Sequence, residues 1–460
     1  MAKIKLTTPK QRHDAGHALR QKCPRNSHGK VVFGRGTKRD IVALIEATEE
    51  GRLENLIPIR HGRMLQSPFA YFRGTANIQA YDLSRTPWSG IMVQACGDCH
   101  LLNFGGFATP ERNLVFDIND FDETLPAPFE WDIKRLAASF VIAARWRGFK
   151  PGQAREMAVR AVASYRESMR QRAGTGVLEG WYSRITVDDV FAMMGRNGEE
   201  LGGLKKRIAR ARKQTQEHVF NKITRPVRGV PRIVDQPPLL YHIKGINERV
   251  LADFFKRYRE TLPEERRFLF DRFKAVDAAL KVVGVGSVGT RCFIVLFLAA
   301  PDDPLFLQVK EARRSVLDRY TGLPRVTHNG RRVVIGQRLM QSASDIFLGW
   351  SRGPGGRDFY VRQLRDMKMA PDIANHTPGI MRQYATLCGL TLARAHDKAG
   401  DAAMIAGYLG SSDHFDEAIG DYAVAYADQV ERDYATFVKA VRSGRLKSDL
   451  SPSGLTTALR

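Results

Sequence analysis

The chain has 460 residues, 43% of them hydrophobic and 26% charged, which excludes a disordered or fibrous protein and gives room for two lobes. Its 72 lysines and arginines exceed its 49 aspartates and glutamates by 23, so we expect attraction to polyanions such as nucleotides, nucleic acid or acidic lipid surfaces. The longest apolar run, 292–300, falls far short of the ~20 residues that cross a bilayer, so we expect no membrane span.

The first segment, residues 1–55, is predicted to be a basic N-terminal arm. Asp14 and Asp40 are the only acids among its first forty residues, where basic side chains dominate. We expect this arm to be mobile and to contact polyanions. No apolar stretch of signal-peptide length occurs near the start, and the five cysteines are too scattered for a disulfide framework. These features predict a cytoplasmic protein.

Residues 56–200 are predicted to hold loops that carry chemistry, followed by helices. A stretch rich in aromatic, glycine and acidic residues runs to about residue 130, and apolar side chains then recur at helical spacing over 131–147 and again from Pro151. Residues 201–281 begin with a basic, proline-rich surface segment that we interpret as a linker. A helical pattern follows over 247–281.

From residue 282 the pattern changes from helix to strand. Apolar or β-branched runs at 292–298, 305–309 and 332–339 are separated by Gly, Pro and Asp, which predicts an antiparallel sheet over 282–370. Residues 371–460 return to helix, with a start signal at Thr377-Pro378 and a last long helix over about 413–442.

The densest group of chemically competent side chains lies between residues 97 and 123. The run G-D-C-H-L-L-N at 97–103 is followed by an apolar strand at 114–118 and by N-D-F-D-E at 119–123. Phosphoryl transfer to a hydroxyl needs one carboxylate to accept the proton, and an amide with a second carboxylate to hold Mg²⁺ on the phosphates. Asp98 fits the first role, Asn103 and Asp120 fit the second, and Asp122 is a reserve metal ligand.

These runs resemble the catalytic and metal loops of aminoglycoside phosphotransferase-like kinases, which read G-D-x-H-x-x-N and then I-x-D-F-x-D/E. The run W-D-I-K-R-L at 131–136 is similar to the helix that follows these loops in such enzymes. The run L-A-R-A-H at 392–396 resembles the helix that precedes them. The resemblance implies the protein kinase-like fold and a nucleotide as phosphoryl donor.

Residues 96–100 also read C-G-D-C-H, which matches the attachment motif of c-type haem. That attachment requires export to an oxidising compartment, so we expect no haem. A tetrahedral zinc site would need a second pair of ligands, which the sequence does not offer. We therefore interpret Cys96 and Cys99 as small packing residues beside the loop.

The run G-V-G-S-V-G at 284–289 follows a short apolar strand and matches G-x-G-x-x-G. A Rossmann unit would continue as a helix, whereas a kinase glycine-rich loop continues as the second strand of a hairpin. The β-rich sequence at 290–297 favours the kinase form, in which glycines let backbone N–H groups approach phosphates closely. The predicted nucleotide-binding residues of this loop are Gly284, Gly286, Ser287 and Gly289.

Lys310 ends the next predicted strand, at the position of the kinase lysine that binds the α- and β-phosphates. Its usual partner is a glutamate on the following helix. Glu311 is adjacent and Asp318 is short, so the sequence identifies no clear acidic partner. Residues 332–341 are interpreted as further strands that lead to an adenine-binding hinge.

The order of the motifs is unusual, because a kinase places the glycine loop and lysine before the catalytic and metal aspartates. We therefore predict an α/β (α+β), two-lobe, kinase-like fold that is circularly permuted and carries extra C-terminal helices. The expected function is ATP-dependent, Mg²⁺-assisted phosphoryl transfer to an unidentified hydroxyl or phosphate. Nucleotidyl transfer on the same fold, with the nucleotide bound the other way round, is an alternative.

A longer stretch, from about 56 to 429, is similar to a family of uncharacterised bacterial proteins, with signatures at 63–74, 96–105, 119–124, 283–291 and 360–368. This resemblance implies no activity. Arginines in or near these signatures are candidates for phosphate binding because the guanidinium is a planar, bidentate donor. They are Arg63, Arg73, Arg338, Arg362 and Arg365.

A rival hypothesis from another class is a non-catalytic polyanion-binding protein that uses the arm and the basic segment 205–232. Its affinity would fall steeply with salt, whereas a kinase-like pocket would still bind Mg·ATP at moderate salt.

Overall fold

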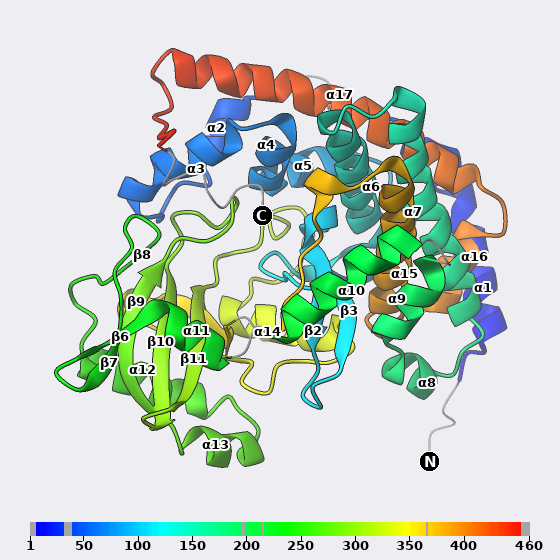
Figure 1. Cartoon of the computed structure of the whole chain (residues 1–460). Coiled ribbons are helices and arrows are strands. Elements are labelled where there is room, and N and C mark those ends of the chain that lie inside the picture. Colours follow the sequence, from blue (N-terminus) through cyan, green and yellow to red (C-terminus); the bar gives the residue numbers. More distant parts are fainter. Residues whose placement is uncertain (1–5, 32–38, 195–197, 214–215, 365–366, 452–460) are drawn as a thin grey trace.

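The computed structural model describes residues 6–31, 39–194, 198–213, 216–364 and 367–451. The protein is a mixed α/β structure with several separate sheets. Figure 1 shows the largest sheet on one side of the molecule and a large group of helices on the other. The predicted chemical residues come from both sides.

The largest sheet has six antiparallel strands in the order β12-β13-β11-β10-β9-β8. Side chains alternate across a strand, so Leu307 and Val309 of β11 pack with the helices on one face while Lys310 lies on the other. The strands are β8 (Leu240–Tyr241), β9 (Lys274–Lys281), β10 (Cys292–Ala300), β11 (Asp303–Glu311), β12 (Gly349–Arg352) and β13 (Asp358–Gln363).

Two helices with aromatic side chains cover one face of this sheet. α12 (Glu248–Arg259) begins after Asn247, whose side chain accepts a hydrogen bond from Val250 N at 3.0 Å, and α13 (Glu264–Phe270) follows. Aromatic rings of both helices pack with the β11 residues named above. Burial of such side chains contributes ~1.5–3 kcal/mol each. Since α12 and α13 cover one face of the sheet, Lys310 lies on the other face, toward the helical side of the molecule.

The helical side is built on α6 (Phe129–Trp146), α7 (Pro151–Arg172), α15 (Pro378–Lys398) and α17 (His414–Arg442). α7 packs against α6 and α15, and α17 runs across α6 and α7 and reaches α2 and α4 (Figure 1). The other α-helices of the described residues are α1 (Pro9–Ala18), α2 (Ile41–Glu46), α3 (Ile57–Met64), α4 (Pro68–Gly74), α5 (Ala76–Leu83), α8 (Val177–Tyr182), α9 (Val187–Met194), α10 (Gly198–Arg212), α11 (Gln216–Ile223), α14 (Asn329–Met340) and α16 (Ala402–Leu409).

The strong helix signals of the sequence mark real boundaries. α7 begins at Pro151, and α15 begins at Pro378 after Thr377, whose side chain accepts a hydrogen bond from Ile380 N. Proline is tolerated there because the first N–H groups of a helix have no partner within it. α17 lies within one residue of the predicted 413–442. These predictions are confirmed.

Two small sheets carry the loops that were predicted to be catalytic. β1 (Met92–Ala95) pairs with β4 (Leu125–Pro128), and β2 (Phe104–Ala108) pairs with β3 (Leu114–Ile118), which also pairs with β5 (Ile185–Thr186). Asn119, the residue after β3, donates from its backbone N to the backbone O of Asn103, the residue before β2, at 2.7 Å. Loops 96–103 and 119–124 therefore lie side by side.

The described part of residues 1–55 is packed against the helices, so the prediction of a mobile arm is wrong there. α1 lies along α16 so closely that a Cβ on Gly16 would lie 1.9 Å from Met404 O. Arg20 donates to Tyr408 O at 2.8 Å, and Arg25 donates to Leu409 O. Basic side chains thus satisfy the unpaired carbonyls at the end of α16, which holds the segment down. Residues 1–5 and 32–38 lie outside the described residues.

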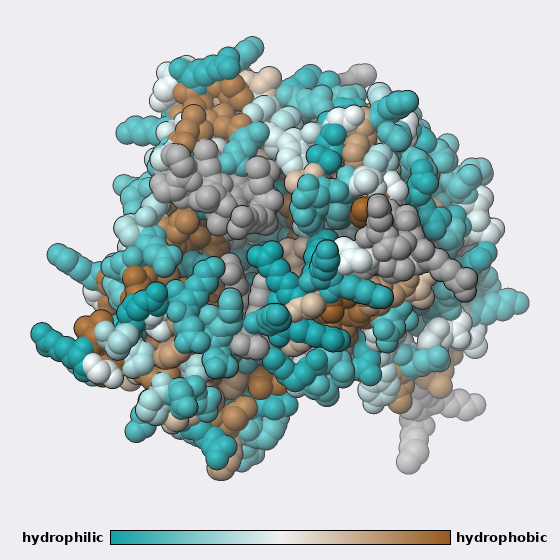
Figure 2. All heavy atoms as spheres, viewed as in Figure 1, coloured by the Kyte–Doolittle hydropathy of each residue, from teal (hydrophilic) through white to brown (hydrophobic). Residues whose placement is uncertain are grey.

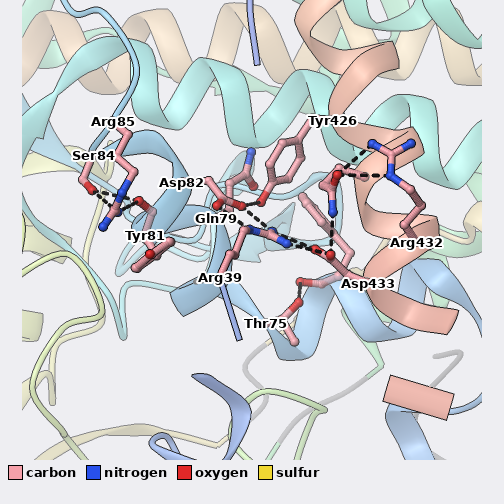
Figure 3. Close-up of polar contacts among 12 residues, drawn as sticks. Arg39, Thr75, Gln79, Tyr81, Asp82, Ser84, Arg85, Tyr426, Arg432 and Asp433 are labelled. Carbon is pink, nitrogen blue, oxygen red and sulfur yellow. Dashed lines mark hydrogen bonds and ion pairs between the residues drawn. The ribbon is translucent and has the colours of Figure 1, made fainter. Parts of the chain in front are cut away.

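The segment is also fixed at Arg39, just before α2. Figure 3 shows this guanidinium between Asp82 of α5 and Asp433 of α17. It donates to both carboxylates at 2.6–2.7 Å, and Tyr426 OH donates to Asp82 Oδ2 at 2.9 Å. This cluster joins the beginning of the chain to its last helix.

The prediction of strands over 332–341 is wrong, because these residues form most of α14. Val333, Val334 and Met340 are completely buried. A Cβ on Gly336 would lie 2.5 Å from Thr124 Oγ1, so the helix passes close to the second loop. Tertiary packing here overrides the preference of valine for strands.

The helix predicted over 247–281 is shorter than expected. It comprises α12 and α13, and the chain from Lys274 onward is β9, because it pairs with β10. The basic segment before it is not a simple linker. It contains α10, α11 and a hairpin of β6 (Thr224–Val227) and β7 (Val230–Ile233).

The visible surface is mostly hydrophilic, with small scattered hydrophobic patches (Figure 2). None of the helices in the described part of the chain combines the length and the apolar composition that a membrane span requires.

Candidate functional site

A cavity of about 530 Å³ lies where the helical side of the molecule meets the six-stranded sheet. Loop 96–103 contributes Asp98 and Asn103, the second loop contributes Asp120 and Asp122, and the glycine-rich loop contributes 284–287. Residues of α2, the segment 47–52, α3, α4, α5 and the segment 311–325 also line it. Stretches of sequence that lie nearly 200 residues apart thus share one cavity.

The first loop is held in place by Asp132, near the start of α6. Its carboxylate accepts hydrogen bonds from Cys96 N at 2.6 Å and Gly97 N at 2.9 Å, and lies 3.2 Å from His396 Nε2 of α15. Gly97 has a φ of +85°, and a Cβ there would lie 2.3 Å from Glu123 O, so glycine is required. The two helix motifs noted in the sequence therefore meet at this loop.

Asp98 is held by Arg135, which lies one turn after Asp132 in α6. Arg135 donates to Asp98 Oδ1 from Nε at 2.8 Å and approaches it with Nη2 at 2.7 Å. His100 Nε2 lies 3.9 Å from Asp98 Oδ2, and burial lowers the pKa of His100 to about 3, so this ring is neutral at pH 7. Asn103 Nδ2 donates to Asp98 O at 2.6 Å, which engages the nitrogen of the amide rather than its oxygen.

Lys310 reaches the second loop from the end of β11. Its Nζ donates to Asp122 Oδ2 and lies 3.9 Å from Asp120 Oδ2. Tyr360 OH donates to Asp122 Oδ1 at 2.8 Å, and Ser287 Oγ donates to Oδ2 at 3.3 Å. Burial would lower the pKa of Lys310, but the two carboxylates raise it well above its ordinary value. The ammonium group is therefore charged, and its acidic partner is Asp122.

Asp120 remains ionised although it lies in the cavity. Burial raises its pKa, but the positive charges of Lys310, Arg362 and Lys368 outweigh burial and lower the pKa below its ordinary value. Its Oδ1 accepts a hydrogen bond from Asp122 N at 3.2 Å. Asp120 thus offers a charged oxygen to the cavity at neutral pH.

The glycine-rich loop is fixed near both of its ends. Gly284 and Gly289 have φ values of +65° and +87°, a backbone region that favours glycine. Arg63 donates to Gly284 O, and Arg52 donates to Val288 O. The segment before α3 and α3 itself therefore hold the loop against the cavity.

The donor set of the two loops fits a magnesium ion bound together with phosphate. Among the described residues no group of three or more His, Cys, Asp or Glu side chains is arranged to hold a metal ion by itself. Magnesium usually needs only one or two carboxylates, with substrate phosphates and water as the other ligands. The Asp120 carboxylate and the Asn103 amide oxygen would provide this. Asp122 is already engaged by Lys310, Ser287 and Tyr360.

Most of the predicted site residues line the cavity, but not all. Lys310 and Gly289 are not part of the lining: Lys310 contacts Asp122, which lines the cavity, and Gly289 lies against Arg52. Of the predicted phosphate-binding arginines, Arg73 lines the cavity. Three others make different contacts: Arg63 donates to the glycine-rich loop, Arg338 donates to Leu348 O, and Arg362 donates to Gln308 and Asn119. Arg365 is outside the described residues.

Sequence reasoning missed the second wall of the cavity. It is formed by basic residues at 52, 60 and 313, and Glu123 lies beside them. Each arginine is a single charged residue in a basic chain, without a motif around it, so only the fold could select the three. Glu123 belongs to the N-D-F-D-E run, but no role could be assigned to it from the sequence. Tyr360, which donates to Asp122, begins the signature at 360–368, but nothing in that signature indicated the contact.

The cysteines of the first loop are packing residues. Cys96 and Cys99 are buried, and burial raises the pKa of the Cys99 thiol well above its ordinary value. Cys96 Sγ lies 3.4 Å from Asp120 O, where it supports the contact between the two loops.

Comparison with known proteins identifies one family. A family model described as an uncharacterized protein conserved in bacteria matches residues 52–440. No curated protein and no solved structure matches the chain. The family match includes both loops, the glycine-rich loop and Lys310.

Proposed function

Because the chain belongs to the bacterial family DUF2252, whose description names no activity, we propose a function from the cavity itself. We propose that the protein is an ATP-dependent, Mg²⁺-assisted phosphotransferase with a circularly permuted, two-lobe kinase-like fold. Its acceptor is a hydroxyl or phosphate group.

The contact between Lys310 and the second loop carries this proposal. In kinases, a glycine-rich loop, a lysine on the third strand and a metal-binding aspartate converge on the nucleotide phosphates. Here β9, the glycine-rich loop, β10 and β11 lead to Lys310, which contacts Asp122 across a separation of 188 residues. The same arrangement with the two halves in exchanged order is what a circular permutation of a kinase would give.

The residues predicted from the sequence have the following roles in this proposal. Asp98 accepts the proton of the attacking hydroxyl through Oδ2, since Arg135 engages Oδ1. Backbone N–H groups of the glycine-rich loop and the ammonium of Lys310 bind the phosphates. Asp120 and Asn103 would hold Mg²⁺, which would neutralise part of the charge of the phosphates.

Asp122 takes a different role from the reserve metal ligand that the sequence suggested. The kinase lysine is normally paired with a glutamate on the next helix. The next helix here is α14, which contains no glutamate, and its Arg332 donates to Asp122 O at 2.7 Å and Thr124 O at 2.6 Å. We therefore assign Asp122 as the partner that positions Lys310.

Titration calorimetry with Mg·ATP tests the proposal. The wild-type protein should bind Mg·ATP, and Lys310→Met and Asp120→Asn should each weaken binding about tenfold or more, because each removes a charged contact to phosphate or metal. Lys439→Met on the exposed face of α17 is the matched control and should bind normally. Thermal unfolding of each variant checks that it is folded. A folded wild-type protein that does not bind Mg·ATP would contradict the proposal.

Radiolabelled ATP without any acceptor tests the chemistry. Asp98→Asn should bind Mg·ATP like wild type but lose hydrolysis or self-modification by about 10²-fold or more. Label transferred from the γ-phosphate indicates a kinase, and label transferred from the α-phosphate indicates the nucleotidyl transferase alternative. Binding that disappears at moderate salt and ignores Asp120→Asn would instead indicate the non-catalytic polyanion-binding protein.

A further inference from the structure

Acidic and basic side chains both line the cavity. The acids of the two loops, Asp98, Asp120 and Asp122, lie together beside the glycine-rich loop. Three arginines form the second wall, which comes from the segment before α3, from α3 and from the chain after β11. These wall residues are Arg52, Arg60 and Arg313. The proposed kinase chemistry accounts for the acids but gives this wall no role.

The three wall arginines are close neighbours. Arg52 Nε and Arg313 Nη1 donate to the same acceptor, Thr48 O, at 2.8 and 2.9 Å. Arg60 Nη2 donates to Gly74 O at 2.9 Å. Burial lowers the pKa of Arg52 and of Arg60, and repulsion from the neighbouring arginines lowers both further. The pKa of Arg60 falls to about 10. The three guanidinium groups are therefore close enough to repel one another.

The unpaired N–H groups of Arg60 indicate that this wall binds a ligand. Its side chain is 1% exposed and lines the cavity, yet Nε and Nη1 have no hydrogen-bond partner. The nearest carboxylate, Glu49 Oε1, lies 3.6 Å from Nη1 and is hydrogen-bonded to His61 Nε2 at 2.6 Å. A buried guanidinium with unsatisfied N–H groups costs free energy, which an anion in the cavity would recover.

We propose that Arg60, Arg52 and Arg313 form a phosphate-binding subsite in the cavity, separate from the metal-binding acids. A phosphate group suits the subsite because its oxygens accept several hydrogen bonds and guanidinium groups bind it in a bidentate manner. The phosphate comes either from a phosphorylated acceptor or from the phosphate chain of the nucleotide. This inference extends the proposed function by giving the site a second anionic group to recognise.

Calorimetry with inorganic phosphate alone, without nucleotide or metal, tests the subsite. The wild-type protein should bind phosphate, and Arg60→Gln should weaken binding about tenfold because it removes a charge-assisted contact. Arg60→Lys should restore part of the affinity. Arg313→Gln, at a more exposed position that is less important for folding, should weaken binding in the same direction.

The matched control is Arg155→Gln, a half-buried arginine of α7 that pairs with Glu417 and Asp421 and does not line the cavity. It should bind phosphate like wild type. Equal phosphate affinity of wild type, Arg60→Gln and Arg313→Gln, each shown to be folded, would overturn the subsite. Absence of phosphate binding by the wild-type protein in the millimolar range would also overturn it.

A second titration distinguishes the two sources of the phosphate. Asp98→Asn is saturated with Mg·ATP, and inorganic phosphate is then added. Phosphate that still binds indicates a subsite for the acceptor, and phosphate that is displaced indicates a subsite for the nucleotide chain. Both results support the subsite. Since phosphate binding is measured without ATP, failure of the subsite and failure of the proposed kinase activity give different results.

Discussion

Glu123 is the acid of the cavity whose charge changes near neutral pH. Burial raises its pKa from 4.5 to about 7, although Arg332 opposes this. The folded state therefore binds this proton more tightly than the unfolded state. The resulting stabilisation is complete below pH 4.5 and is lost as pH rises to about 7 and above. We expect Glu123→Gln, which resembles the protonated acid, to reduce the fall in melting temperature between acidic and mildly alkaline pH.

Melting curves of wild type and Glu123→Gln across this pH range measure the effect. Glu417→Gln on α17, at an exposed residue paired with Arg155, is the control and should keep the wild-type slope. If Glu123→Gln kept the same slope as wild type, Glu123 would not be the titrating group.

At the scale of single elements, the first loop depends on the start of α6. Asp132 is 1% exposed and satisfies two backbone N–H groups of this loop. We expect Asp132→Ala to lower the free energy of unfolding by about 2–5 kcal/mol, because it leaves buried donors unsatisfied. Urea denaturation measures this change. Asp421→Ala, an exposed aspartate of α17, should change it by less than about 0.5 kcal/mol.

The sequence predicted elements well where local signals agreed with the packing. Proline and threonine marked the starts of α7 and α15, and β10 and β11 were recognised as a hairpin. It failed for α14, where Val333 and Val334 suggested a strand. Their burial against other elements decides the helix, and no local signal contains that information.

At the scale of the whole molecule, the candidate site was predicted as two groups of motifs, and the structure brings both to one cavity. Short motifs could be read because loop geometry restricts their residues, as at Gly97. The arginine wall could not be read, since Arg60 and Arg313 belong to segments 253 positions apart and meet only through the fold. The partner of Lys310 was hidden for the same reason.

The ion pairs of Arg39 test how much the beginning of the chain contributes to the stability of the whole protein. It bridges Asp82 and Asp433 in a buried cluster. We expect Asp433→Ala to destabilise the protein by about 1–3 kcal/mol, since the buried guanidinium loses one of its two carboxylate partners and keeps Asp82. Asp428→Ala, which pairs with Arg145 at the exposed surface of α17, should have little effect. Similar melting temperatures for both variants would show that the cluster contributes little.

The cavity lining continues outward to Arg314, Arg319 and Arg325, which are exposed residues of the segment after β11. Exposed positive charge at an entrance accelerates the diffusional encounter with an anion, and dissolved ions screen this attraction. The association rate constant of an anionic ligand should therefore fall as ionic strength rises, while its dissociation rate constant, which depends on buried contacts, stays nearly constant. Ionic strength would then control how fast this protein captures its ligand more than how long it retains it.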